Sequence, residues 1–236
     1  MRTNWLPRSR RLFPNAPPVS DPPWSATGLV AAAAVSAIPF ALGVADRAFG
    51  LFMFYALACL YGRNPLIANP SLPYVGWLLL AHATLPPLGT GAGLFRSAPP
   101  GWRFSPKLQG AAWLLLAAGY SYTGYTKLVS PSWLDGTAIT RVLESPLARP
   151  GFVRETLLSL PAPLLSALSY GALALELFFL PLALIAPLRP YLWAALLGMH
   201  LSLMGLIDFA ELSFGMLLFH LFVADPDWWR RLKWYR

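Results

Sequence analysis

The chain has 236 residues, of which 56% are hydrophobic and only 12% are charged. A soluble domain usually carries about 25% charged residues, so this composition argues against a protein whose whole surface faces water. The formal net charge is +8, and the basic residues gather near both ends beside tryptophan and tyrosine. That combination is typical of segments at an anionic lipid surface, so we expect a lipid bilayer as partner and no nucleic acid.

Residues 1–24 are rich in proline and arginine. Closely spaced prolines oppose both helix and strand, so we expect an extended arm here. The first apolar run follows this arm and is long enough to span a bilayer, so we expect it to remain as a span and not to be a cleaved signal. Residues 230–236 form a short basic tail, which leaves residues 25–229 as a predicted transmembrane helix bundle.

Apolar runs separated by arginine, proline and glycine predict an all-α, polytopic membrane bundle of six or seven spans, since a bilayer-crossing helix needs about 20 apolar residues. These runs cover residues 25–45, 49–62, 72–88, 108–126, 164–186, 190–207 and 212–224. Residues 128–163 are more polar and mix charged with large apolar side chains. This segment therefore predicts amphipathic helices at the membrane interface between spans four and five.

Lysine and arginine positions predict the orientation. With seven crossings the basic residues divide evenly between the two sides, and the positive-inside rule decides nothing. If one short run does not cross, or if the last two runs form a re-entrant hairpin, the basic residues concentrate on the side of the N-terminal arm. This favours an even number of crossings with both ends in the cytoplasm.

Ionisable side chains within the apolar runs are the first candidates for function, because each costs about 2.5–3.5 kcal/mol at a helix centre on insertion scales. They are His82, Lys127, Glu176, His200, Asp208, Glu211 and His220. His82 and His220, alone on apolar faces, fit hydrogen-bonded core groups. His200 and Asp208, eight apart, fall close to one helix face, and with Glu211 they fit a proton relay or a metal. Their spacing matches no specific ligand motif, so we predict no metal-ion site among them. A haem held by two of the three histidines stays open, although no haem-attachment motif is present.

Tyr120, Thr123, Gly124 and Lys127 are spaced i, i+3, i+4 and i+7, which places them on one face of a helix. Two interpretations of the lysine stay open. It extends to lipid headgroups, as a lysine at a helix end commonly does, or it is a partly desolvated amine that acts as a base near neutral pH. Glu176, near the middle of the fifth span, is either a structural carboxyl or a functional one.

Two neighbouring motifs resemble a known membrane family. Gly124-Tyr-Thr-Lys127-Leu, followed by Trp133-Leu-Asp-Gly136, resembles the Gly-x-x-Lys-Leu, Trp, Gly pattern of one transmembrane domain. Vitamin K-dependent gamma-carboxylases share this domain with the bacterial horizontally transferred transmembrane domain proteins. Arg63-Asn-Pro-Leu-Ile67 is similar to a stretch common in the bacterial members. The resemblance covers nearly the whole chain from residue 25 to 229 and implies a protein of the bacterial inner membrane.

The later helices also resemble this family, through Glu176, His200, Phe209 and Ser213-Phe-Gly-Met216. The resemblance implies that Lys127 is the catalytic base that deprotonates a quinol, with His200 as a helper in the same pocket. The chain ends shortly after its last apolar run, so we expect no counterpart of the extramembrane domain with which carboxylases recognise their protein substrate. A more distant likeness, to small quinone-linked membrane proteins of the DoxX type, leaves the reaction open.

Three classes of function follow, and whether the chain is an enzyme stays open. The first is a carboxylase-like membrane oxidoreductase that binds a quinol between helices, with Trp113, Tyr120, Thr123 and Glu176 lining the cofactor site. The alternative is a noncatalytic accessory or scaffolding subunit of a larger respiratory or photosynthetic membrane complex. A transporter or proton channel built on Glu176, Asp208 and Glu211 is less favoured, because the sequence has no inverted repeat.

Overall fold

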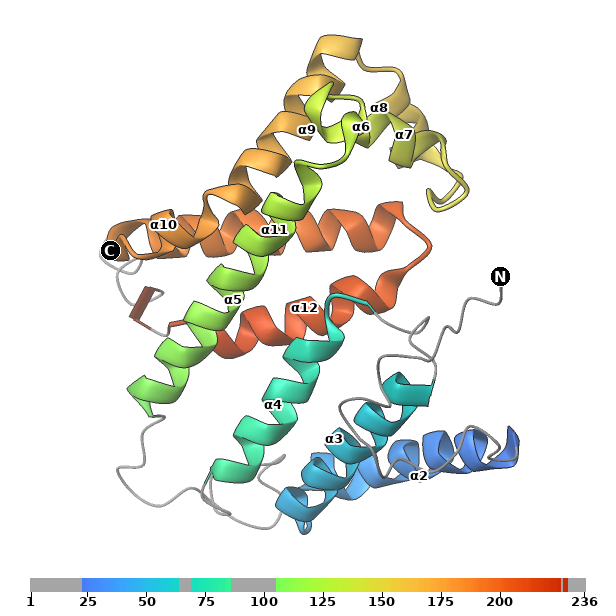
Figure 1. Cartoon of the computed structure of the whole chain (residues 1–236), viewed down its shortest axis with the longest axis vertical. Coiled ribbons are helices and arrows are strands. Elements are labelled where there is room, and N and C mark those ends of the chain that lie inside the picture. The colour runs from blue at the N-terminus through green and yellow to red at the C-terminus, as the bar shows by residue number, and fades with distance from the viewer. Residues whose placement is uncertain (1–22, 64–68, 86–104, 226, 229–236) are drawn as a thin grey trace, which may run out of the picture. The chain divides into compact units, whose positions relative to one another are not determined.

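The computed structural model describes residues 23–63, 69–85, 105–225 and 227–228 (Figure 1). Within these ranges the regular elements are helices, and the extended backbone is limited to an isolated bridge between Ala148 and Ile207. The predicted all-α class is therefore confirmed for the described residues. Residues 1–22 of the predicted arm, the basic tail and residues 64–67 of the family-like stretch lie outside them.

The chain divides into two compact units, Met1–Trp102 and Arg103–Arg236. Each unit is described by itself below. The single bundle predicted over residues 25–229 therefore stays a prediction.

The described part of the first unit contains three helices in sequence, α2 (Pro23–Leu42), α3 (Asp46–Arg63) and α4 (Leu72–Thr84), with α3 packed against both others. The chain reverses between α2 and α3 at Gly43, whose φ of 74° suits glycine because a side chain is disfavoured there. The helices match the predicted spans 25–45 and 49–62 and the described part of 72–88.

A polar contact joins the start of α3 to the end of α4. Asp46, which is buried, holds the Nε2 atom of His82 at 3.1 Å from its Oδ2 atom. The next residue, Arg47, donates from Nε to the carbonyl oxygen of Leu85 at 2.9 Å. The ring of Phe40 lies 4.6 Å from the His82 ring, centroid to centroid. The interpretation of His82 as a hydrogen-bonded group is confirmed, with Asp46 as its partner, although its side chain is only partly buried.

The second unit is built around α5 (Pro106–Lys127), which packs against α9 (Ala162–Leu177), α10 (Phe179–Ala183) and α12 (Ala210–Val223). The 3₁₀ turn η2 (Ala186–Leu188) leads into α11 (Arg189–Leu206), which packs along α12 (Figure 1). The predicted fifth span, 164–186, is thus broken into pieces. Pro181 is a local cause, because it has no N–H to donate to the carbonyl of Leu177.

Short helices fill the segment that was predicted to be amphipathic. They are α6 (Pro131–Leu134), α7 (Ala138–Glu144) and α8 (Phe152–Leu158). The loop after α7 is tied to the turn between α11 and α12, because Arg149 forms an ion pair with Asp208 at 3.0 Å. The backbone N–H of Asp208 also donates to the carbonyl of Leu147 at 2.7 Å.

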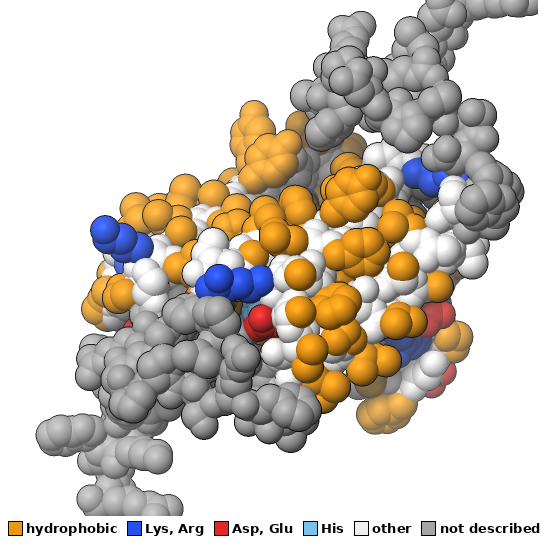
Figure 2. Space-filling view, turned by 90° about the horizontal axis from the view of Figure 1, so that it is seen from below, with side chains coloured by type: hydrophobic (Ala, Val, Ile, Leu, Met, Phe, Trp, Pro, Cys, Tyr) orange, Lys and Arg blue, Asp and Glu red, His pale blue; other side chains and the backbone are white. Residues whose placement is uncertain are grey.

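Many large apolar side chains of the described helices are exposed, and apolar side chains are prominent on the face that Figure 2 shows. Among the described helices, one stretch, Ser25–Leu42 of α2, is long and apolar enough to cross a membrane. Helices α8 and α9 are long and apolar enough to cross a membrane only when they are counted as one span, and the chain bends by 108° between them. A membrane-crossing helix is thus supported by its length and composition, while the number of spans stays a prediction.

Candidate functional site

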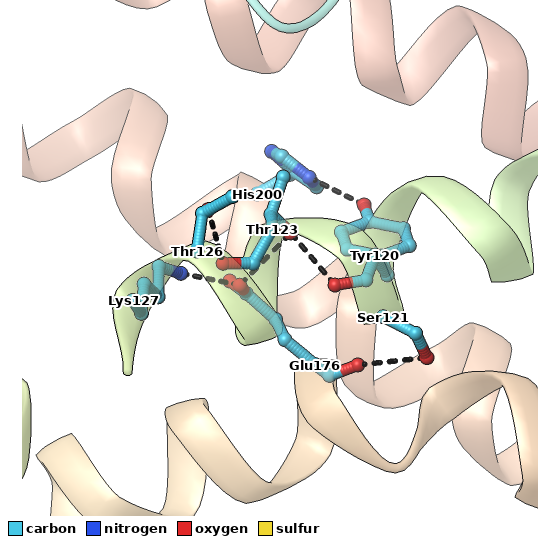
Figure 3. A network of polar contacts seen from close by, with 7 residues as sticks. All are labelled: Tyr120, Ser121, Thr123, Thr126, Lys127, Glu176 and His200. Atoms are coloured by element: carbon cyan, nitrogen blue, oxygen red, sulfur yellow. Dashed lines mark hydrogen bonds and ion pairs between the residues drawn. The ribbon is translucent and has the colours of Figure 1, made fainter. Parts of the chain in front are cut away.

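Lys127, the last residue of α5, points its amine at the carboxylate of Glu176 on α9 (Figure 3). The Nζ atom donates a hydrogen bond to Glu176 Oε2 and forms an ion pair with it. The Thr123 hydroxyl lies 3.1 Å from the same carboxylate oxygen. The Lys127 side chain is 24% exposed and that of Glu176 only 7%. The lysine side chain is therefore partly exposed, whereas the carboxylate that it pairs with is shielded.

Gly124 explains how this pair forms. A Cβ atom at this position would lie 2.6 Å from Leu177 Cα, closer still to Leu177 N, and 2.9 Å from the carbonyl carbon of Glu176. Only glycine therefore lets the backbones of α5 and α9 approach this closely. Because Thr123 and Lys127 flank Gly124 and contact the Glu176 side chain, the prediction that these residues share one helix face is confirmed.

Trp133, on α6, covers the other side of the lysine. Its ring centroid lies 4.5 Å from Lys127 Nζ, a cation–π contact. The turn after Trp133 is held by Asp135, whose carboxylate accepts hydrogen bonds from the hydroxyl of Thr137 at 2.6 Å and from its backbone N–H at 2.9 Å. These bonds from Thr137 lower the pKa of Asp135. Sequence reasoning used Trp133 only as part of a motif and missed this contact.

The hydroxyl of Ser121 occupies the break between α9 and α10. It accepts a hydrogen bond from the N–H of Leu180 at 2.8 Å and lies 3.3 Å from the carbonyl oxygen of Glu176, to which it donates. In an unbroken helix these two backbone groups would bond to each other, because they are four residues apart. Insertion of a side chain into this ladder is a recognised cause of helix kinks. The break therefore starts at Glu176.

We expect Ser121→Ala to destabilise the second unit by about 1–3 kcal/mol, because it leaves the N–H of Leu180 and the carbonyl of Glu176 without their shared partner. Ser202→Ala is the matched control, since the exposed Ser202 hydroxyl bonds only within its own helix, to the carbonyl of Met199. Reversible unfolding in mixed micelles measures both. Equal free energies of unfolding for the two variants would show that the hydrogen bonds of Ser121 do not stabilise the second unit.

A second polar cluster lies deeper on the same face of α5. The Tyr120 hydroxyl is 2.6 Å from Nε2 of His200 on α11 and 3.5 Å from Nε2 of His220 on α12. The Nδ1 atom of His200 is 3.4 Å from the Ser213 hydroxyl, and Nδ1 of His220 is 2.8 Å from the carbonyl of Met216. Tyr120, both histidines and Ser213 are buried. The interpretation of His220 as a hydrogen-bonded core group is confirmed.

The structure brings together five of the predicted site residues, Tyr120, Thr123, Lys127, Glu176 and His200 (Figure 3). Trp113 lies about two helical turns from Tyr120 along α5, and the ring of Phe179 contacts both aromatic side chains. Trp113 lines a separate cavity of about 300 Å³ together with Gln109, Arg189 and Trp228. Lys127 is not among the residues that line this cavity.

The prediction that Asp208 shares a helix face with His200 is wrong. Helix α11 ends at Leu206, so Asp208 lies in the following turn, where its exposed carboxylate pairs with Arg149. Glu211 is also exposed, in the first turn of α12. Within the described ranges no group of three or more histidine, cysteine, aspartate or glutamate residues is placed to hold a metal ion.

The arrangement can hold and transfer protons. It combines a partly exposed lysine of α5, its shielded carboxylate partner on α9 and, two turns back along α5, a buried cluster of Tyr120 with histidines of α11 and α12. No protein-family model, curated protein or solved structure matches this chain.

Proposed function

We propose that this chain is an integral membrane protein in which the Lys127–Glu176 pair takes a proton from a membrane-dissolved quinol. The observation that carries the proposal is the pairing of a partly exposed lysine, at the end of a helix, with a shielded carboxylate. A carboxylate buried in apolar surroundings is costly unless it is paired and hydrogen-bonded. Such a group is therefore a candidate for function as well as for structure.

The distribution of polar and apolar side chains supports the membrane part of the proposal. In the second unit the buried side chains include Ser169, Glu176, His200, Ser213 and His220. Large apolar side chains are exposed on the same helices, among them Leu164, Leu168, Leu201, Phe214 and Leu221. A soluble domain keeps few large apolar side chains exposed over such long stretches. Lipid would cover these side chains and leave the polar cluster inside.

The residues around Lys127 fit a quinol hydroxyl. The amine offers a polar partner, and exposed apolar side chains, Tyr125, Val129 and Leu134, flank it in the chain. A bound quinol supplies a weakly acidic hydroxyl and reducing power toward dioxygen. The cavity beside Trp113 is a separate space, and no role in the proton step falls to it.

Lys127 must be uncharged to accept a proton. The hydrogen bond to Glu176 Oε2 provides a way, because a proton that passes from Nζ to the carboxylate leaves a neutral amine and a neutral acid. Nζ can then take the hydroxyl proton and become an ammonium group. The Trp133 ring and the Thr123 hydroxyl hold the two partners in place during this exchange.

We expect the purified protein in nanodiscs to consume dioxygen only when a quinol is present. One quinol loses two protons and two electrons, and one dioxygen takes them to form hydrogen peroxide, so quinone and peroxide should appear in equal amounts. An oxygen electrode, a peroxide assay and mass spectrometry of extracted quinone measure these quantities. Absence of quinol-dependent uptake would contradict the catalytic proposal.

Native mass spectrometry after mild extraction separates this proposal from its alternative. A single chain that retains a quinone supports the enzyme. Stoichiometric foreign membrane subunits without quinone would instead favour an accessory or scaffolding role in a larger complex.

A further inference from the structure

Tyr120 stands between two histidines in the interior of the second unit. Its hydroxyl has one proton to donate, and it faces the Nε2 atoms of both His200, at 2.6 Å, and His220, at 3.5 Å. All three side chains are buried, so water does not compete for these contacts. The heavy atoms therefore define a short hydrogen-bonded chain that runs from α11 through α5 to α12.

The outer partners constrain where the protons lie. The Met216 carbonyl only accepts, so Nδ1 of His220, 2.8 Å away, carries a proton, and Nε2 of a neutral His220 is an acceptor. His200 is less constrained, because its Nδ1 faces the Ser213 hydroxyl, which can donate or accept. His200 can therefore bear its proton on either nitrogen while the heavy atoms stay in place.

We propose that His200, Tyr120 and His220 form a proton relay in the interior of the second unit, next to the Lys127 site. In its starting state His200 has its proton on Nε2, and an added proton binds at Nδ1. The Nε2 proton of His200 then moves to the Tyr120 oxygen as the Tyr120 proton moves to Nε2 of His220. His200 is left neutral with its proton on Nδ1, Tyr120 is unchanged, and His220 becomes an imidazolium.

The Lys127 site acts on this relay through charge. Tyr120 and Thr123 lie one helical turn apart on α5, and Lys127 interacts electrostatically with His200. A positive charge on Lys127 repels a proton on His200 and so favours its place on His220. Among the described residues, the charges that bear on His200 are those of His220 and Lys127, and Lys127 is in turn paired with Glu176 of α9, while α10 contributes the Phe179 ring. The role of the relay in turnover rests on the proposed function, whereas the geometry of the three side chains is independent of it.

The chain has only three histidines, which makes ¹⁵N-histidine NMR of the protein in nanodiscs a direct test. We expect the ring signals of His200 and His220 to move together over one pH range, because they share one added proton. In Tyr120→Phe, which keeps the aromatic ring, the two histidines should respond separately. His82, which pairs with Asp46 in the first unit, is the internal control and should be unaffected.

Independent titration of His200 and His220 in the wild-type protein would overturn the relay, as would ring signals that stay neutral and unmoved until the protein unfolds. The wild-type measurement decides this even if Tyr120→Phe fails to fold. No quinol is present in the experiment. A relay that fails this test leaves the proposed quinol reaction standing, and a relay that passes does not depend on that reaction.

Discussion

Replacing Lys127 with alanine should lower quinol-dependent oxygen uptake by about 10²- to 10⁴-fold, the usual contribution of a general base. The reason is that Lys127 is the more exposed partner of the ion pair, while the Glu176 side chain is shielded. Steady-state oxygen uptake measures the loss, and circular dichroism checks that the helices remain. Lys107→Ala is the control, because Lys107 is an exposed lysine near the opposite end of the same helix. It should leave uptake unchanged.

The Lys127→Arg variant distinguishes the role of Lys127 as a base from its role in the ion pair with Glu176. A guanidinium group keeps its positive charge and can still pair with Glu176, but it stays protonated in proteins and cannot accept a proton. We therefore expect stability near that of the wild-type protein together with activity as low as that of Lys127→Ala. An arginine variant that retains the uptake would show that Lys127 serves the site only by its charge.

Gly124→Ala should destabilise the second unit by about 3 kcal/mol, near the upper end of the usual cost of overpacking. The added methyl group would meet the backbone of Glu176 and Leu177, and backbone cannot turn aside as a flexible side chain can. Helices α5 and α9 would have to separate, which also pulls Lys127 from Glu176. We therefore expect the uptake to fall together with the free energy of unfolding.

Gly110→Ala is the matched control on the same helix. A Cβ atom at Gly110 has nothing within 4 Å, and alanine is the better helix former by about 0.5–1 kcal/mol. This variant should therefore be as stable as the wild-type protein or slightly more stable. If both alanine variants behave alike, close packing at Gly124 does not determine the contact between the two helices.

The local pattern was sufficient to locate the helices. Long apolar runs bounded by proline, glycine and arginine predicted α2, α3, α5 and α11 to within a few residues, because helix formation and termination depend on near neighbours. The spacing of Thr123, Gly124 and Lys127 placed them correctly on one face for the same reason. Pro181 was a signal for the break after Glu176, although the run 164–186 was predicted as one span.

The sequence by itself determined that the chain is helical, rich in apolar surface, and carries ionisable groups where few are expected. Only the tertiary structure decided which of these groups meet. Lys127 and Glu176 are 49 residues apart, and Asp46 and His82 are 36 apart. Their pairing depends on how closely and at what angle the helices cross. The packing of side chains along whole helices determines both the distance and the angle. The end of α11 likewise excluded Asp208 from the His200 face, and the packing of α5 against α12, which itself packs along α11, placed Tyr120 between two histidines.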